Sequence, residues 1–465
     1  MKNKSVILKS DSYKFSQWNQ YPKDTTRVFS YIESRGGTED TMMALLQYII
    51  VENLCTPITM ADVDYAEKRI TKHGLPFNRE GWEYIVKEHG GKLPLSIRAV
   101  PEGTVVPSKN VLVSVVNTDP KCYWLTSYIE TLLLRVWYPI TVATTSLNCK
   151  RVIKKFLTET ADNLDGLPFK LHDFKLHDFG YRGVSSEESA AIGGAAHLFN
   201  FMGSDTFAAN ELLSDYYDAD MASYSIPASE HSTITSWERK NEKAAYENML
   251  ETYGKGPIFA CVSDSYNIFE AIKMWGTMKD RIKELGTTVV VRPDSGDPEV
   301  MSVQCVEELG TAFGFTWNSK GYRVLNNVRV IYGDGIDNPR VIENILTNLK
   351  IRKWSADNIA FGMGGGLLQK CNRDTFKFAM KCSAIVKNET EMVEVYKEPV
   401  GMPEKNSKRG FLDLVLENGK YKTVNIPWYD KPSENSVMRE VYRNGELLIE
   451  ENLETVRARA NAACA

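Results

Sequence analysis

The hydrophobic pattern of the chain changes near residue 170. Beyond this point, short runs of β-branched and aromatic residues each end in a polar or glycine-rich turn, and a helical pattern follows. This alternation predicts strands that lead into helices. Strands are expected at 176–179, 257–262, 287–292, 328–332 and 358–361. A helix is expected from the capping-box pattern at 185–188 to about 199, and a second after the turn at 263–265 that runs through 275. A third should begin at about 298, and a fourth should cover roughly 338–349.

Strand–helix units that recur every 30 to 40 residues or so are typical of an α/β barrel. We therefore expect a barrel domain at 151–379. The two ends of the chain lack this rhythm, and strands separated by turns are expected there at 95–106, 111–116, 375–386 and 392–396. The ends, 1–150 together with 380–465, are expected to form a second, β-rich α+β domain. No low-complexity linker separates the two domains, which indicates that they are interleaved.

Polar residues gather where the predicted strands end, which is where α/β barrels place their active sites. The group holds arginines, aspartates, a histidine and two glycine-rich turns: Arg182, Arg292, Arg373, Asp205, Asp264, Asp294, Asp334, His231, 333–335 and 362–366. Glycine turns before helices let backbone N–H groups approach a phosphate, and arginine adds bidentate contacts. Carboxylates suit sugar hydroxyls, or Mg²⁺ held through water. The set indicates a phosphorylated sugar with several phosphates as the substrate.

Each of these residues also has a purely structural interpretation. Asp264 could be a helix N-cap, Gly333 and Gly335 could be ordinary turn residues, and His231 could be a hydrogen-bonded structural histidine. No Walker motif is present, and a single Gly-Met-Gly-Gly-Gly run is weak evidence. The hypothesis therefore depends on the whole series falling at strand ends.

Composition narrows the class of protein. The 465 residues are 43% hydrophobic and 25% charged, as in an ordinary globular protein, and the net charge of −4 argues against a nucleic-acid binder. The eight cysteines show no Cys-x-x-Cys spacing and no nearby Cys/His set, so we expect no zinc site and a reducing, cytoplasmic location. No apolar run reaches the length of a signal-peptide core or a membrane helix, so no membrane partner is expected.

Residues 170–174 and 175–179 are identical copies of Lys-Leu-His-Asp-Phe. Because side chains alternate along a strand, a shift of five residues turns equivalent side chains to opposite faces. Both copies cannot fill one buried strand, so one copy must loop out. If the first copy took the strand, Phe179 and Arg182 would be displaced.

Seven segments spread over nearly the whole chain resemble the nicotinamide phosphoribosyltransferase family. They include His-Asp-Phe-Gly-Tyr-Arg-Gly-Val-Ser-Ser, Pro-Ala-Ser-Glu-His-Ser-Thr and Arg-Pro-Asp-Ser-Gly. In chain order the segments are 11–14, 137–144, 177–186, 227–233, 262–266, 292–296 and 362–370. The family has only one copy of the duplicated pentapeptide.

The resemblance implies an incomplete α/β barrel of the type II phosphoribosyltransferases beside the β-rich domain, in a homodimer whose active sites lie between the subunits. It implies a pentosyltransferase of NAD salvage, which makes nicotinamide mononucleotide and pyrophosphate from nicotinamide and 5-phosphoribosyl-1-pyrophosphate. ATP would stimulate the reaction as a co-substrate. Mg²⁺ would be bound mainly through pyrophosphate and water.

The resemblance also implies roles for individual residues. Phe179 and Tyr13 of the neighbouring subunit would enclose the nicotinamide ring, and Asp205 would accept a hydrogen bond from its carboxamide. His231 resembles the family's phosphorylated histidine, and with Asp294 and Asp205 it would take a catalytic role. Residues around the ring, ribose and phosphates would include Arg182, Arg292, Gly333, Asp334, Gly364, Gly365, Arg373, Asp264, Ser225, Arg35 and Lys408.

Two other functions fit the same motifs. A nicotinate phosphoribosyltransferase shares the fold, but a carboxylate at Asp205 would repel nicotinate and favour the neutral amide. A catalytically impaired binding protein is the second alternative, because the duplication lies directly before the signature segment. It would bind nicotinamide or the sugar phosphate without releasing pyrophosphate.

Overall fold

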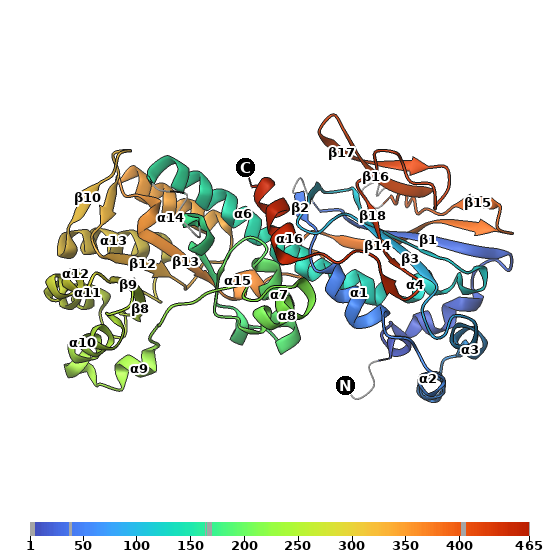
Figure 1. Cartoon of the computed structure of the whole chain (residues 1–465), viewed down its shortest axis with the longest axis horizontal. Coiled ribbons are helices and arrows are strands. Elements are labelled where there is room, and N and C mark those ends of the chain that lie inside the picture. Colours follow the sequence, from blue (N-terminus) through green and yellow to red (C-terminus); the bar gives the residue numbers. More distant parts are fainter. Residues whose placement is uncertain (1–4, 37–39, 163, 165–169, 401–405, 465) are drawn as a thin grey trace. The chain divides into compact units, whose positions relative to one another are not determined.

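A computed structural model describes residues 5–36, 40–162, 164, 170–400 and 406–464 (Figure 1). The chain divides into two compact units. The first unit is Met1–Thr141 with Asn372–Ala463, and the second is Val142–Cys371 with Cys464–Ala465. The first boundary falls inside helix α6, Trp137–Thr160, whereas the sequence analysis places the two boundaries after 150 and 379.

A parallel sheet of six strands forms the centre of the second unit. Its order is β7-β6-β13-β12-β9-β8, with bounds Gly203–Ser204, Leu176–Asp178, Ile359–Met363, Val328–Tyr332, Thr288–Arg292 and Ile258–Val262. The helices are α7 Glu187–His197, α8 Ala208–Tyr217, α9 His231–Thr235, α10 Glu242–Tyr253, α11 Ile268–Thr277, α12 Lys279–Leu285, α13 Pro298–Phe313, α14 Pro339–Ile351 and α15 Gly365–Leu368. A hairpin of β10 Phe315–Trp317 and β11 Arg323–Leu325 lies between α13 and β12 in the sequence. The strands and helices predicted for this unit are confirmed, with ends that differ by one or two residues.

An irregular segment, residues 224–229, joins the two edges of this sheet. Tyr224 forms a parallel bridge with Gly203 in β7, and Ala228 forms a parallel bridge with Ala260 in β8. A backbone hydrogen bond of 2.8 Å supports each end. The barrel therefore lacks a full set of regular strands, yet its backbone ring is closed by this segment.

The second copy of the duplicated pentapeptide forms β6, and the first copy forms a short 3₁₀ helix, Leu171–Phe174. The fully buried Leu176 of the second copy pairs with Phe361 of β13. The first copy stays attached to the sheet, because Met202 N–H donates to Asp173 O at 2.8 Å. The expectation that one copy must leave the strand is confirmed, and Phe179 keeps its place directly after β6.

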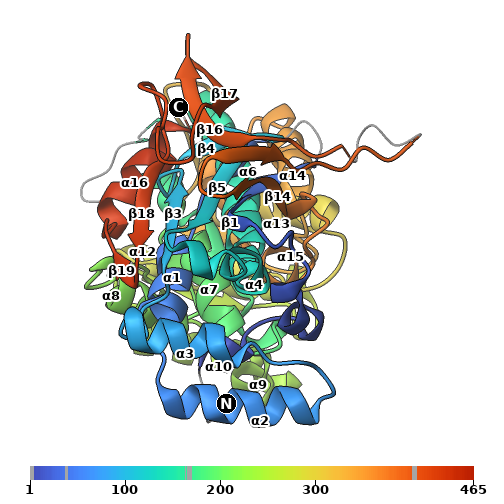
Figure 2. The ribbon, with the colours of Figure 1, turned by 90° about the vertical axis from the view of Figure 1, so that its right-hand side faces the viewer.

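An antiparallel sheet of seven strands, assembled from both ends of the chain, forms the centre of the first unit (Figure 2). Its order is β15-β14-β1-β5-β3-β18-β19, with bounds Glu391–Glu394, Phe378–Lys387, Thr25–Ser34, Val111–Asn117, Leu95–Ala99, Arg439–Arg443 and Glu446–Leu447. Two small sheets pair β2 Asp40–Met42 with β4 Val105–Pro107, and β16 Phe411–Glu417 with β17 Lys420–Ile426. The helices are α1 Leu46–Leu54, α2 Met60–Lys72, α3 Arg79–Glu88, α4 Leu125–Tyr128, α5 Glu130–Leu133 and α16 Leu453–Ala462, with α2 and α3 side by side in both views.

The two units confirm the predicted fold class, an incomplete α/β barrel with a second, β-rich domain. Within the described ranges, no helix is both long enough and apolar enough to span a membrane.

Candidate active site

Most of the predicted site residues lie at the carboxyl ends of the parallel strands. They are Phe179 after β6, Asp205 after β7, Asp264 after β8, Arg292 and Asp294 at β9, Gly333 and Asp334 after β12, and Gly364 and Gly365 after β13. Because parallel strands end at the same edge of a barrel, the fold gathers these residues at one rim. Ser225 lies in the segment that closes the ring, and His231 begins helix α9 just after it.

The ring of Phe179 lies directly over β13. A Cβ atom on Gly362 would come within 2.1 Å of the ring carbon Cε2, so only glycine fits below it. A Cβ on Gly333 would reach the ring at 3.4 Å. Inside the barrel, the half-buried Phe179 packs against a buried apolar cluster of Ala260, Val290 and Ile331. This close packing fixes an aromatic surface on which a flat ligand ring can stack.

Asp205 follows β7, the strand next to β6, which leads into Phe179. Its backbone N–H donates to Asp178 O at 3.0 Å, which anchors it to the end of β6. Its side chain is exposed, and Oδ1 accepts a hydrogen bond from Ser225 Oγ at 2.7 Å. Asp205 therefore presents a fixed hydrogen-bond acceptor to solvent.

His231 and Asp264 form a hydrogen-bonded pair at the rim. His231 Nε2 lies 3.0 Å from Asp264 Oδ1, and the other oxygen accepts from the Asp294 N–H at 2.9 Å and from Ser295 Oγ at 2.6 Å. Burial alone would raise the pKa of Asp264, but these hydrogen bonds outweigh it and hold the pKa below the usual range. The N-cap of α11 is Asn267, so the N-cap interpretation of Asp264 is wrong.

Ser229 anchors the segment that leads into His231 to strand β8. The Ser229 side chain is buried, and its Oγ accepts a hydrogen bond of 2.9 Å from the backbone N–H of Val262 in β8. The imidazole itself is 48% exposed, so a ligand can reach its second ring nitrogen. The purely structural interpretation of His231 therefore does not account for its exposure.

Arginine side chains and glycine turns complete the rim in the second unit. Arg292 NH2 lies 3.7 Å from Asp294 Oδ2, while its buried Nε has no partner in the described part of the chain. A Cβ on Gly366 would come within 2.7 Å of Asp337 Cα, so the turns after β12 and β13 pack closely. Arg182 is exposed on the 3₁₀ helix Tyr181–Gly183, with no ion pair to any described residue.

The remaining predicted residues belong to the first unit. Tyr13 is 60% exposed, on the 3₁₀ helix Ser12–Asn19. Arg35 follows β1, and Arg373 lies before β14. Lys408 forms an ion pair with the buried Glu33. Lys408 is therefore already paired with a buried carboxylate.

Lys381 is a further cation that the sequence analysis missed. It lies in β14, and burial together with the positive charges of Arg35, Lys397 and Arg373 lowers its pKa, against the opposing effect of Glu130. A group of neighbouring cations that lowers the pKa of one member is typical of an anion-binding surface. A lysine inside an otherwise apolar strand, Phe378–Lys387, is the signal that could have revealed it.

Asp178 is a buried carboxylate at the base of the site. It is fully buried at the end of β6, and its Oδ1 accepts a hydrogen bond of 2.7 Å from the Gly180 N–H. Burial raises the pKa of Asp178 to about 6, although the Gly180 amide and the Thr206 hydroxyl oppose the shift. The loop that carries Phe179 is thus held by a carboxyl group that titrates close to neutrality.

We predict that Asp178→Asn increases the free energy of unfolding above about pH 6 and leaves it almost unchanged below about pH 4. The folded state favours the protonated carboxyl, so the natural chain loses stability as the pH rises between these values. A shift of this size corresponds to about 3 kcal/mol. Urea unfolding followed by circular dichroism from pH 4 to 8 measures it, with the exposed Asp220→Asn as control. A difference that stays constant with pH would contradict the assignment.

Comparison with known proteins identifies the family of this chain. Residues 174–446 match the nicotinate phosphoribosyltransferase (NAPRTase) family, and residues 5–97 match the nicotinamide phosphoribosyltransferase N-terminal domain. The chain is 50% identical to a nicotinamide phosphoribosyltransferase of Xanthomonas campestris over 99% of its length and 98% of that protein. It is 32% identical to a nicotinamide phosphoribosyltransferase of Mycoplasma pneumoniae, over 88% of this chain and 95% of that one.

Solved structures agree at the level of the fold. The nicotinate-nucleotide pyrophosphorylase of Pyrococcus furiosus superposes with a TM-score of 0.61 at 15% identity, over 98% of this chain and 95% of that one. Human nicotinic acid phosphoribosyltransferase superposes with a TM-score of 0.56 at 16% identity, over 98% and 93%. The long matches in sequence carry the assignment further than these distant folds do: the chain belongs to the nicotinamide phosphoribosyltransferases of the NAPRTase family.

Proposed function

We propose that this chain transfers the phosphoribosyl group of 5-phosphoribosyl-1-pyrophosphate to nicotinamide, which yields nicotinamide mononucleotide and pyrophosphate for NAD salvage. The observation that carries the proposal is the ring of Phe179 over Gly362, at a rim that also presents Asp205, Arg292 and two glycine turns. Family membership supports the same reaction. The eight cysteines are all free thiols, which suits a cytoplasmic enzyme.

The chemistry needs charge stabilisation rather than a covalent nucleophile. The pyridine nitrogen of nicotinamide forms a bond to C1 of the ribose, and the C1–O bond to pyrophosphate breaks with its electron pair on the leaving oxygen. Positive charge develops on the ribose, where Asp294 and Asp334 offer carboxylates, and negative charge develops on pyrophosphate, where Arg182 and Arg292 offer cations. Glycine turns at the strand ends supply backbone N–H groups for phosphate oxygens.

Mg²⁺ fits the donor set at this rim. Asp264 is buried and its oxygens are taken by hydrogen bonds, so it is unsuited to a metal. Asp294 and Asp334 are more accessible, and exposed carboxylates suit Mg²⁺ held through water. When bound with the substrate, the ion would neutralise charge on the pyrophosphate.

Asp205 gives the site its preference for the amide. Its carboxylate, oriented by Ser225, can accept a hydrogen bond from the carboxamide NH₂ of nicotinamide. The carboxylate of nicotinate would instead meet a like charge. This residue therefore separates the proposed activity from that of a nicotinate phosphoribosyltransferase.

We predict that the purified chain, supplied with Mg²⁺ and 5-phosphoribosyl-1-pyrophosphate, forms mononucleotide from nicotinamide with a higher kcat/KM than from nicotinate. Asp205→Asn should narrow this preference by about 10-fold or more, because it removes the repulsive charge. Chromatography of the nucleotide product, with a coupled pyrophosphate assay, measures both reactions. The exposed Asp220→Asn is the matched control. Preference for nicotinate in the natural chain, or binding without pyrophosphate release, would refute the proposal.

The duplicated pentapeptide provides a matched pair of phenylalanines. We predict that Phe179→Ala raises KM for nicotinamide by about 10-fold or more, because each stacked base or ring contributes about 1–3 kcal/mol. Phe174 is the equivalent residue of the first copy and lies in a 3₁₀ helix. Phe174→Ala should change KM for nicotinamide by less than about twofold. Steady-state kinetics on both variants measures the difference. Equal effects at the two positions would contradict the placement of the second copy in β6.

His231 is the proposed site of ATP-dependent phosphorylation. With Nε2–H donating to Asp264, the lone pair of the imidazole lies on Nδ1. Nδ1 can attack the γ-phosphorus of ATP, and ADP leaves with the electron pair of the broken bond. Asp264 holds the Nε2 proton and stabilises the positive charge on the ring. The 48% exposure of the imidazole leaves room for this transfer.

We predict that His231→Asn abolishes ATP stimulation, so that the ratio of rates with and without ATP falls to about 1. The same substitution should remove acid-labile label transferred from ATP labelled at the γ-phosphate, because phosphohistidine is the labelled group. The exposed His73→Asn is the control and should retain both responses. Label that persists in His231→Asn would place phosphorylation elsewhere.

The cations of the first unit are proposed to act on the phosphates within a homodimer. Partial burial lowers the pKa of Lys381, and the nearby charges of Arg35 and Arg373 add to this effect. 5-Phosphoribosyl-1-pyrophosphate brings the negative charge that such a cluster needs. The exposed Tyr13 offers a second aromatic surface. In a homodimer, these residues of one copy would complete the barrel rim of the other.

We predict that mixing two inactive variants restores activity if the sites are shared. Arg35→Ala removes a cation of the first unit, and Asp294→Ala removes a carboxylate of the second. After subunit exchange in equal amounts, half of the dimers contain one intact site, which gives about one quarter of the natural activity. Arg35→Ala mixed with Arg373→Ala is the control and should restore none. No recovery in the first mixture would refute shared sites.

A further inference from the structure

A nitrogen, an oxygen and a sulfur donor meet in the first unit, in residues to which the proposed function gives no role. His89 follows α3 as its C-cap, Asp119 is the N-cap of the 3₁₀ helix Pro120–Cys122, and Cys122 ends that helix. One ligand atom from each of the three side chains lies within 4.8 Å of the other two. Residues three apart in a 3₁₀ helix project from the same face, which explains why Asp119 and Cys122 converge.

The surrounding contacts hold this cluster in place. Asp119 Oδ2 lies 2.9 Å from His89 Nε2 and accepts a hydrogen bond of 2.9 Å from the Tyr84 hydroxyl, while Oδ1 accepts from the Lys121 N–H at 2.8 Å. The aspartate orientation is thus set by three groups. Cys122 Sγ is fully buried and has no hydrogen-bond partner among the described residues. The fixed oxygen and imidazole therefore lie beside a thiol that no other polar group uses.

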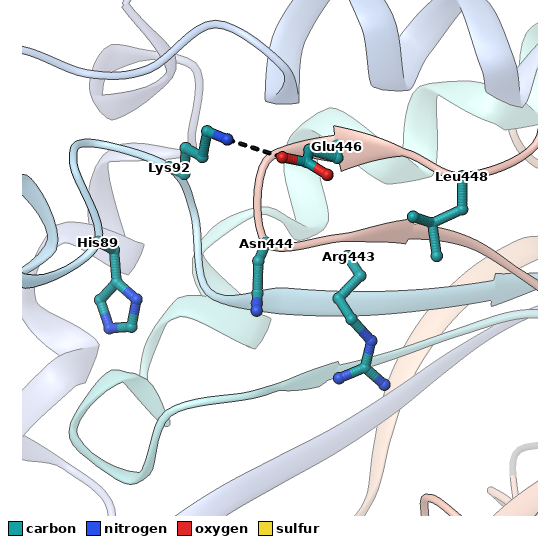
Figure 3. A pocket seen from close by; sticks show the side chains of 6 residues that line it. All are labelled: His89, Lys92, Arg443, Asn444, Glu446 and Leu448. Carbon is teal, nitrogen blue, oxygen red and sulfur yellow. Dashed lines mark hydrogen bonds and ion pairs between the residues drawn. The ribbon is translucent and has the colours of Figure 1, made fainter.

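A cavity of about 370 Å³ lies against the His89 side of the cluster. His89 forms part of its wall, and the rest is lined by Lys92, Arg443, Asn444, Glu446 and Leu448 (Figure 3). Lys92 and Glu446 are paired at 2.8 Å, so the wall carries little uncompensated charge from these two groups. The space is large enough for a hydrated ion to enter and for water to remain.

We propose that His89, Asp119 and Cys122 bind a divalent transition metal of the Zn²⁺ type, with water in the fourth position. Imidazole, carboxylate and thiolate are the three ligand types that Zn²⁺ takes in proteins, in tetrahedral geometry at about 2.0 to 2.3 Å. A softer donor such as thiolate disfavours Mg²⁺ and Ca²⁺. The site would be distinct from the Mg²⁺ proposed at the barrel rim, which has oxygen donors alone.

Metal binding here must displace one proton. Cys122 binds a metal ion as the thiolate, so its thiol proton must leave. The ion would replace that proton, which passes to solvent, and would replace the contact between His89 and Asp119 with two metal bonds. No zinc site is expected from the sequence because its cysteines and histidines are not closely spaced. Here the fold supplies His89 from another helix.

The test uses the full chain after chelator treatment, with Zn²⁺ in equilibrium dialysis and Co²⁺ as a spectroscopic probe. One ion per chain is expected, and bound Co²⁺ should show a thiolate-to-metal charge-transfer band with tetrahedral d–d absorption. Cys122→Ser should remove the band and weaken Zn²⁺ binding by about 100-fold or more. The half-buried Cys55→Ser, in the same unit, is the control and should change neither.

Tyr84→Phe is a milder variant that keeps the three ligands and removes the hydroxyl that orients Asp119. Loss of such an outer contact should weaken Zn²⁺ binding by about 10- to 100-fold, with the Co²⁺ band retained. Circular dichroism and nicotinamide mononucleotide formation verify that each variant is folded. Zn²⁺ that binds equally to Cys122→Ser, or Co²⁺ without a thiolate band in the natural chain, would overturn the proposal.

Discussion

The closed ring of backbone around the barrel is the constraint on which the rest of the site depends. Six parallel strands supply most of the ring, and residues 224–229 join the edge strands β7 and β8. Because every strand in the ring points the same way, the residues that follow them share one rim. The joining segment orients Ser225 toward Asp205 and leads directly into His231. A single backbone connection thus positions both the group proposed to select the amide and the group proposed to accept phosphate.

Close packing gives the rim of the barrel a surface of defined shape. Phe179 can approach β13 this closely only because Gly362 has no side chain, and the turns after β12 and β13 can meet only because Gly366 has none. Asp178, buried beneath the loop of Phe179, is retained although burial opposes its charge. Rigid aromatic surfaces and preorganised dipoles suit a reaction in which charge develops on ribose and pyrophosphate. This arrangement costs stability when Asp178 is ionised, because its carboxyl group is buried.

The strand positions could be predicted from the sequence because β-branched runs and helical patterns are local signals. The two-residue strand β7 and the segment 224–229 could not, because only pairing with distant strands defines them. Lys381 was missed because its importance comes from charges brought together by the antiparallel sheet, and the ion pair of Lys408 with Glu33 was missed for the same reason. The second pentapeptide copy, by contrast, forms β6 as the strand predicted at 176–179 indicates, and its register with β13 is what only the fold shows.

We propose that the rim after β6 and β13 holds the nicotinamide ring, with the ribose phosphate beside the glycine turns. A crystal structure with nicotinamide mononucleotide bound would show whether it does. Electron density for the pyridine ring should lie against Phe179 above Gly362, with the carboxamide nitrogen within hydrogen-bond distance of Asp205. A ring bound against Phe174, or a nucleotide held away from the carboxyl ends of the strands, would contradict it.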